Sequence, residues 1–191
     1  AEKESNNLLS EALQTLKSKT NPAEAFQVVN TTSWNRTNLV TLPASWNLSD
    51  TYITDDTGKN IESQQLTDGS WVFVASDIPA LSSRKYFVKK GKQKSKTTPA
   101  PSGNTISNGQ INITLNTENG DITAINFKNG PNLVDPKDTL GFNAYWYGGV
   151  VKENLSKQTG ATLKVVEHGN VLTRIQVVSS APGAVSLTRE I

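Results

Sequence analysis

The chain has 191 residues, of which 35% are apolar and 19% charged, and it carries a net charge of +2, no cysteine and one histidine. This length allows one or two domains with a sizeable core, since a domain typically takes about 100–200 residues. Disulfides, thiol catalysis and cysteine-bound metal are excluded, and no apolar run approaches the roughly 18 residues that span a bilayer. A cysteine-free chain is compatible with export, so we expect a periplasmic, secreted or lumenal protein.

Residues 3–19 show a helical pattern that Asn21-Pro22 ends. Everything after Pro22 has strand-like character, so this single helix lacks an obvious partner in the sequence. We therefore interpret residues 1–22 as the end of a helical region that begins upstream. The apolar face of the helix consists of Leu8, Leu9, Ala12, Leu13 and Leu16.

Residues 23–90 are predicted to form a small antiparallel β-sandwich. Short apolar runs alternate there with turn sequences such as Asp-Asp-Thr-Gly at 55–58 and Thr-Asp-Gly at 67–69. Short strands at this spacing are typical of sandwiches. The predicted strands are 26–30, 38–42, 51–54, 61–66, 71–75 and 84–88.

Residues 91–103 are predicted to be a linker. A lysine run at 89–96 holds five Lys and no acidic residue, and without those five the net charge of the rest is +2 − 5 = −3. A nucleic-acid site would favour arginine and interleaved aromatic residues, whereas a solvated connector needs only charge and weak packing. The sequence Thr-Thr-Pro-Ala-Pro-Ser-Gly that follows favours the connector, so no nucleic-acid partner is expected.

Residues 104–191 are predicted to be the first part of a larger β-sandwich. Gln-Ile-Asn-Ile-Thr-Leu-Asn at 110–116 alternates apolar and polar residues, and Asn119-Gly120 is a strong hairpin signal before the returning strand at 122–127. Three further strands, at 161–167, 170–178 and 184–191, are expected to form a meander. The chain ends inside the last of these, so we expect the sheet to continue beyond Ile191.

Few residues offer catalytic chemistry. His168 is the sole histidine and precedes Gly169-Asn170, so we interpret it as a turn residue, because the common zinc sites need several ligands. The nearest carboxylate pairs for glycoside hydrolysis, Asp55-Asp56 and Asp135/Asp138, both lie in turn sequences. Solvated turn acids are the expected reading, and neither a catalytic residue nor a metal ligand is assigned in this chain.

Gly141–Gly149 is the most unusual stretch, because four aromatic residues gather between glycines. Two interpretations are open. The aromatic rings pack in a core or at a sheet edge, or they form a platform on which a sugar ring stacks. The candidate carbohydrate-binding residues are Tyr145, Trp146 and Tyr147, with Phe142 in the same cluster.

Four short elements, in order, carry a resemblance to a known family. They are Asn30-Thr-Thr-Ser33-Trp34-Asn-Arg36; Gly58-Lys59 with Ser63-Gln64; Asp77, Pro79, Leu81 and Tyr86; and Asn108-Gly109 with Gly120 and Ile122. This succession resembles the region behind the catalytic domain of glycoside hydrolase family 38, the retaining α-mannosidases. One departure is Ala-Leu-Ser-Ser-Arg at 80–84, which lacks a glycine that often follows the leucine. We expect Trp34 to pack in the sandwich and Asn30 to cap a turn.

The resemblance implies a mainly β fold, with the second sandwich of the galactose-mutarotase type. It also implies a parent enzyme that binds zinc and uses an aspartate nucleophile, both in a catalytic domain upstream of Ala1. The chain would then be a non-catalytic fragment of an enzyme of mannose or glycan metabolism, without cofactor, with that domain and a glycan as partners. The alternative is a free-standing carbohydrate-binding or adhesion module. A fragment would self-associate through the helix face and through Val185, Leu187 and Ile191 of the last strand.

Overall fold

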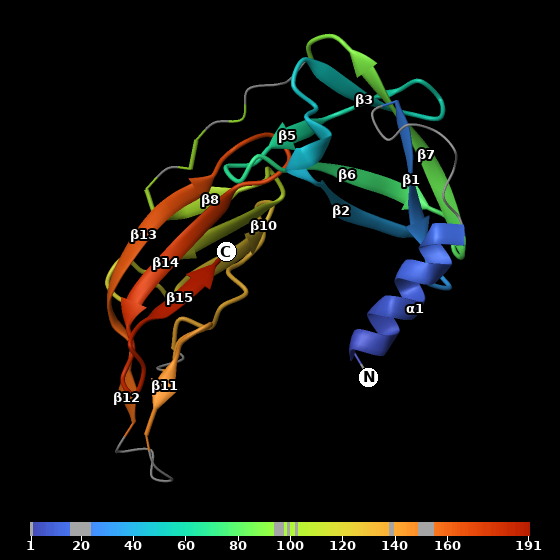
Figure 1. The fold of residues 1–191 in the computed structure, drawn as a ribbon. Helices are drawn as coiled ribbons and strands as arrows, with labels where there is room; N and C mark the ends of the chain where they lie inside the picture. Colours follow the sequence, from blue (N-terminus) through green and yellow to red (C-terminus); the bar gives the residue numbers. More distant parts are fainter. Residues whose placement is uncertain are drawn as a thin grey trace. The chain divides into compact units, whose positions relative to one another are not determined.

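The computed structural model describes residues 2–15, 24–93, 98, 100–101, 103–137, 140–148 and 155–191. The chain is mainly β and divides into two compact units, Ala1–Ser95 and Lys96–Ile191 (Figure 1). The single helix, α1, spans Glu2–Thr15. Leu16 and residues 17–19 of the predicted helix lie outside the described residues, as do the side chains of Leu9 and Leu13; Leu8 is exposed. No helix among the described residues is long and apolar enough to cross a membrane.

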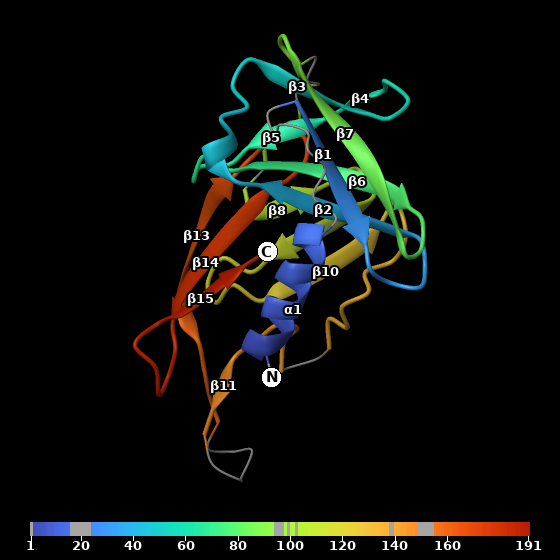
Figure 2. The same ribbon diagram turned by 45° about the vertical axis from the view of Figure 1, so that its right-hand side comes forward.

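The first unit contains two antiparallel sheets. One has the strand order β1-β7-β3-β4 and the other has β2-β6-β5 (Figure 2). The strands are β1 (Ala25–Asn30), β2 (Arg36–Leu42), β3 (Thr51–Asp55), β4 (Asn60–Ile61), β5 (Ser63–Gln65), β6 (Trp71–Ile78) and β7 (Ser82–Lys90), with a short 3-10 helix at Ala44–Trp46.

One core joins the two sheets of this unit, which makes it the β-sandwich that the sequence predicts. Ile53 and Tyr86 come from one sheet, and Leu42 and Phe73 from the other, and all four are buried in one cluster. Phe26 stacks on Tyr86 with a ring-centroid separation of 5.5 Å, while Phe73 meets Tyr86 edge-on at 5.0 Å. Such aromatic contacts add to the stabilisation that area burial alone provides.

The predicted strand at 61–66 is two strands rather than one. Ile61 pairs with Ile53 in the first sheet, whereas Ser63–Gln65 pairs with β6 in the second. The chain therefore passes from one sheet to the other at Glu62. Alternation alone cannot reveal such a crossing, because both halves are short and extended.

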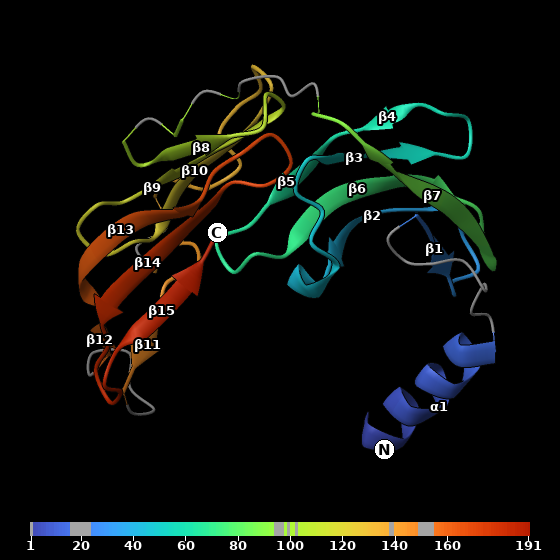
Figure 3. The same cartoon turned by 45° about the horizontal axis from the view of Figure 1, so that its top comes forward.

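The second unit also places two sheets around one core (Figure 3). One sheet has the order β10-β9-β8, and the other is the predicted meander β13-β14-β15. Leu115 and Ile122 from the first sheet and Ile175 and Val177 from the second form its buried cluster. The strands are β8 (Thr105–Ser107), β9 (Ile111–Leu115), β10 (Ile122–Phe127), β11 (Trp146–Tyr147), β12 (Ser156–Lys157), β13 (Thr159–Glu167), β14 (Arg174–Ser180) and β15 (Leu187–Glu190).

The lysine run and the final strand differ in part from expectation. Lys89 and Lys90 end β7, where they pair with β3, while residues 94–97, 99 and 102 of the predicted linker lie outside the described residues. Ile191 packs against the core of its unit and exchanges two backbone hydrogen bonds with Ile175. Val185 does not share this environment, because it precedes β15 and is fully exposed.

Candidate functional site

The aromatic stretch lies on a short hairpin formed by β11 and β12, in which Trp146 is paired with Lys157. Successive residues of a strand point to opposite faces, so Trp146 and Tyr147 lie on opposite faces of the hairpin. The Tyr145 hydroxyl donates to the carbonyl of Pro182 at 3.1 Å. Sugar binding by Tyr145, Trp146 and Tyr147 stays a prediction.

Tyr147 lies tightly against the turn between β14 and β15. Gly183 in that turn has φ +76°, and a Cβ added there would meet the Tyr147 ring at 2.4 Å. Glycine is required for both the left-handed backbone and the close approach of the ring. The outer part of Tyr147 stays open, because 53% of the residue is exposed.

Trp146 is half-buried and contacts both a carbonyl and a cation. Its Nε1 donates to the carbonyl of Leu140 at 2.8 Å. The Nζ of Lys157 lies 5.3 Å from the Trp146 ring centroid, which is within the range of a cation–π interaction. Phe142 is 51% exposed, and forms an isolated bridge to Ile122.

A buried charged cluster, centred on Asp121, joins the hairpin to its unit. Lys157 Nζ lies 2.5 Å from Asp121 Oδ2, and Arg189 Nη1 lies 3.7 Å from Oδ1. The amide Nε2 of the fully buried Gln158 donates to the same Oδ1. A buried carboxylate of this kind requires cationic and hydrogen-bonding partners, and Asp121 has all of them.

The Asp121 cluster links segments that are distant in sequence. Arg189, on β15, donates to the carbonyls of Asn143 and Asn119 at 2.8 and 2.7 Å. A Cβ at Gly141 would lie 2.7 Å from Asp121 Oδ2, so the cluster is closely packed. Retaining glycosidases use two carboxyl groups about 5–5.5 Å apart. Among the described residues, the ion partners of Asp121 are the two cations Lys157 and Arg189, so its contacts are those of a structural ion pair.

Of the first carboxylate pair considered for glycoside hydrolysis, Asp56 is an exposed turn residue as expected, but Asp55 is the last residue of β3 and is buried rather than solvated. Asp55 Oδ1 accepts hydrogen bonds from Thr57 Oγ1 at 2.6 Å and from the backbone N–H groups of Thr57 and Lys59 at 2.9 Å each. The Thr57 hydroxyl, aided by these N–H groups, lowers the pKa of Asp55 although burial opposes the shift. Asp56 lies 4.0 Å from Arg84.

Asp135, from the second carboxylate pair, and His168 both lie outside the strands. Asp135 accepts from the N–H of Lys137, and Asp138 lies outside the described residues. His168 Nδ1 is 3.3 Å from Thr173 Oγ1, and its Nε2 is 3.2 Å from the carbonyl of Thr98. No group of three or more histidine, cysteine, aspartate or glutamate residues that could hold a metal occurs in the described part of the chain. The described residues therefore do not fit a zinc site.

Asn30 organises the loop that follows β1. Its Nδ2 donates to the carbonyls of Trp34, Ile78 and Pro79 at 2.7, 3.0 and 3.0 Å. Its Oδ1 accepts from the N–H and the hydroxyl of Thr32 at 3.0 and 2.7 Å. Asn30 is buried, and it caps the turn as the sequence predicts.

The prediction that Trp34 packs in the sandwich is wrong, because 63% of the residue is exposed. The Trp34 carbonyl faces Asn30, and the residue lies in the loop between β1 and β2 rather than in a strand. The aromatic contacts of the core come instead from Phe26, Trp46, Phe73 and Tyr86. A tryptophan next to a turn carries no sequence signal that separates these outcomes.

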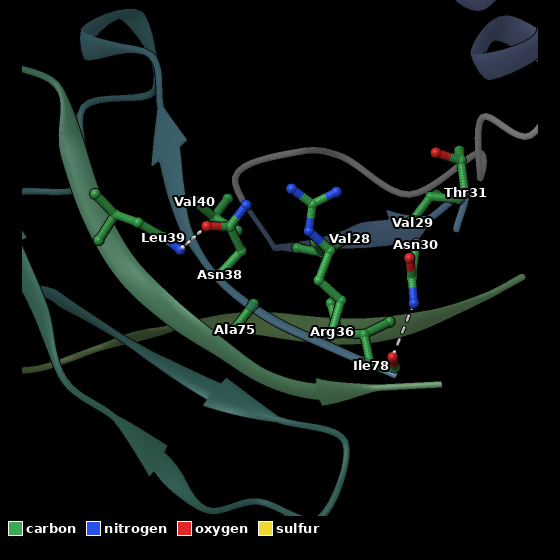
Figure 4. A pocket seen from close by; sticks show the side chains of 10 residues that line it. All are labelled: Val28, Val29, Asn30, Thr31, Arg36, Asn38, Leu39, Val40, Ala75 and Ile78. Carbon is green, nitrogen blue, oxygen red and sulfur yellow. Dashed lines mark hydrogen bonds between the residues drawn. The ribbon is translucent and has the colours of Figure 1, made fainter. Parts of the chain in front are cut away.

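A small groove of about 110 Å³ lies between β1 and β2, each of which is an edge strand of its sheet (Figure 4). Among the residues that line the groove, Asn38 Oδ1 accepts a hydrogen bond from the N–H of Leu39 at 3.0 Å. The lining residues are Val28, Val29, Asn30, Thr31, Arg36, Asn38, Leu39, Val40, Ala75 and Ile78.

Sequence comparison finds no matching family model and no significantly similar curated protein. Two solved structures from Enterococcus faecalis share the fold. A protein in glycosyl hydrolase family 38 matches with a TM-score of 0.59 and 16% identity, over 91% of this chain and 27% of its own. An α-mannosidase matches with a TM-score of 0.58 and 16% identity, over 91% of this chain and 26% of its own.

The chain has the fold of part of a family 38 glycosyl hydrolase. It spans about a quarter of the length of the solved chains that it matches. The resemblance inferred from four short motifs is thereby confirmed for the fold, at an identity too low for conventional sequence comparison.

The Asp121 cluster is the feature that sequence reasoning missed. One signal was available in the last strand, where Leu187, Arg189 and Ile191 fall on one face by alternation. Arg189 is an inward-facing cation between two apolar residues, and its side chain is only 10% exposed. Such a position requires a buried acceptor, but the sequence does not say which of 17 acidic residues supplies it.

Proposed function

We propose that the chain is a non-catalytic β-domain portion of an α-mannosidase-like glycoside hydrolase that acts in carbohydrate metabolism. The observation that carries the proposal is the match of 91% of this chain to about a quarter of an α-mannosidase. Under this proposal, the two sandwiches support a catalytic domain of the same polypeptide, and that domain binds the glycan.

The chemistry of the proposed enzyme belongs to residues outside this chain. Zinc and the aspartate nucleophile would both lie in the catalytic domain, where a metal would orient and polarise the substrate. The acids described here are held in turns or in ion pairs, as with Asp55 and Asp121. Their contribution is to fix loops and to connect strands. An exported location remains part of this proposal, based on the cysteine-free composition.

The proposal is tested with the purified chain and an aryl α-mannoside, with and without added zinc. We expect no turnover above buffer, while an authentic α-mannosidase in the same assay is active. Turnover that a chelator abolishes and zinc restores would contradict the non-catalytic assignment. A mock purification from cells that do not express the chain, assayed in parallel, separates a contaminating enzyme from activity of the chain.

The second candidate function is glycan binding by the hairpin aromatics. It is supported by two half-exposed rings, Phe142 and Tyr147, beside a hydrogen-bonded frame. Titration with mannose oligosaccharides, followed by NMR, would detect it through shifts of hairpin resonances. Tyr147→Ala should abolish those shifts if the ring stacks on sugar, whereas Phe127→Ala, at another half-exposed ring, should leave them unchanged.

A further inference from the structure

Two adjoining loops of the first unit present large apolar side chains to solvent. Trp34 is 63% exposed and Leu81 is 74% exposed. The loops are joined by hydrogen bonds from the N–H of Leu81 to the carbonyl of Thr32, at 2.9 Å, and from the N–H of Ala80 to Asn35 Oδ1, at 3.3 Å. We call residues 31–36 and 79–81 the Trp34–Leu81 surface.

Hydrogen bonds from one side chain connect the two loops of this surface. The buried amide of Asn30 binds both loops, through the carbonyls of Trp34 and Pro79. Leu81 has φ +49°, a left-handed conformation that is unfavourable for a branched side chain. Backbone strain of this kind persists where the surroundings enforce it and is concentrated at binding and switch sites. A partner would therefore meet loops that need little further ordering.

The groove between β1 and β2 extends the same surface, since Thr31 and Arg36 line it. Arg36 is exposed, and within the described part of the chain no hydrogen bond or ion pair satisfies its guanidinium. Tryptophan and arginine are the residue types that most often dominate protein interfaces. The two edge strands contain neither lysine nor proline, the usual protection of a free edge.

We propose that the Trp34–Leu81 surface is the docking face for the catalytic part of the glycoside hydrolase. This inference rests on the proposed function. The occupant follows from length, because about three quarters of each matched chain lies outside the region shared with this one. The partner surface is expected to offer an apolar recess for the indole of Trp34 and a carboxylate for Arg36.

Hydroxyl-radical footprinting with mass spectrometry tests this on the 191-residue chain and on the longer polypeptide that the proposed function requires. Trp34 should be oxidised readily in the chain alone and at least about fivefold more slowly in the longer polypeptide. Val185, fully exposed on the second unit, is the internal control. In the longer polypeptide, Trp34→Ala and Arg36→Glu should lower the melting temperature, whereas both should leave that of the chain alone unchanged.

Equal oxidation of Trp34 in both polypeptides overturns the docking inference. So does protection in the chain alone that rises with its concentration, because the partner would then be a second copy. The outcome is independent of catalysis. An active longer polypeptide with an unprotected Trp34 defeats the docking face alone, while a protected Trp34 in a polypeptide without glycosidase activity defeats the proposed function and leaves a docking face with another partner domain.

Discussion

Replacing Asn30 with alanine is expected to cost the first unit about 2.5–6 kcal/mol of folding free energy. The carbonyl of Ile78 loses a buried hydrogen-bond donor, and a buried group left without a partner costs about 1–3 kcal/mol. The carbonyls of Trp34 and Pro79 and the N–H of Thr32 are part-buried, and each adds about 0.5–1 kcal/mol. This total is a large fraction of the stability of a typical domain, which is about 5–15 kcal/mol.

The assay is urea unfolding followed by tryptophan fluorescence. Trp46 and Trp71 pack against the core of the first unit and report its unfolding. Asn30→Asp keeps the oxygen that binds Thr32 but turns a second oxygen towards three carbonyls, so it should be at least as destabilising as alanine. Asn35→Ala is the matched control, because its single 3.3 Å bond is exposed and its loss should cost less than about 0.5 kcal/mol. A cost below about 1 kcal/mol for Asn30→Ala would refute the reasoning.

Three further predictions concern pH, packing and the connector. The pKa of folded Asp55 lies below its ordinary value of 3.8. The stability that the Asp55 carboxylate contributes is therefore present above pH 3.8 and is lost as the pH falls through the folded pKa. Asp55→Asn should remove this part of the acid sensitivity in unfolding titrations. Gly183→Ala should destabilise the second unit by about 1–3 kcal/mol, because the added Cβ would meet the Tyr147 ring. The control is Gly160→Ala, at a position with a similar φ but no atom within 4 Å of the added Cβ. Equal losses of stability in the two variants would show that packing against Tyr147 is irrelevant. Trypsin should cut first within residues 91–103 and leave two protected pieces, and earlier cleavage at other lysines or arginines would contradict a connector there.

The strands were predictable because alternating apolar residues leave only one way to bury a face. Ile111, Ile113 and Leu115 alternate in β9, and burial rises along this set from the exposed Ile111 to the fully buried Leu115. The turn after Asp55 could likewise be predicted, because an aspartate shortly before Thr and Gly accepts a hydrogen bond from the backbone N–H two residues on. These signals are local, and a single sequence contains them completely.

Other features depend on contacts between distant segments, and these could not be predicted. The cation partners of Asp121 come from 36 and 68 residues away in the chain, at Lys157 and Arg189. Trp146 and Tyr147 lie in a hairpin because β11 pairs with β12, and no composition rule supplies that pairing. Trp34 was wrongly predicted to be buried, because a large apolar residue is usually buried and only the structure shows that this one is exposed.

The central claim is that this chain is part of an α-mannosidase-like enzyme, and the most direct test is an assay of its native polypeptide. Antibodies against the 191 residues would be used to purify that polypeptide, which would then be given aryl α-mannosides before and after chelation. The account predicts hydrolysis that disappears with the chelator and returns with zinc, carried by a polypeptide several times longer than this chain. A native polypeptide that hydrolyses no α-mannoside under any metal condition would contradict it.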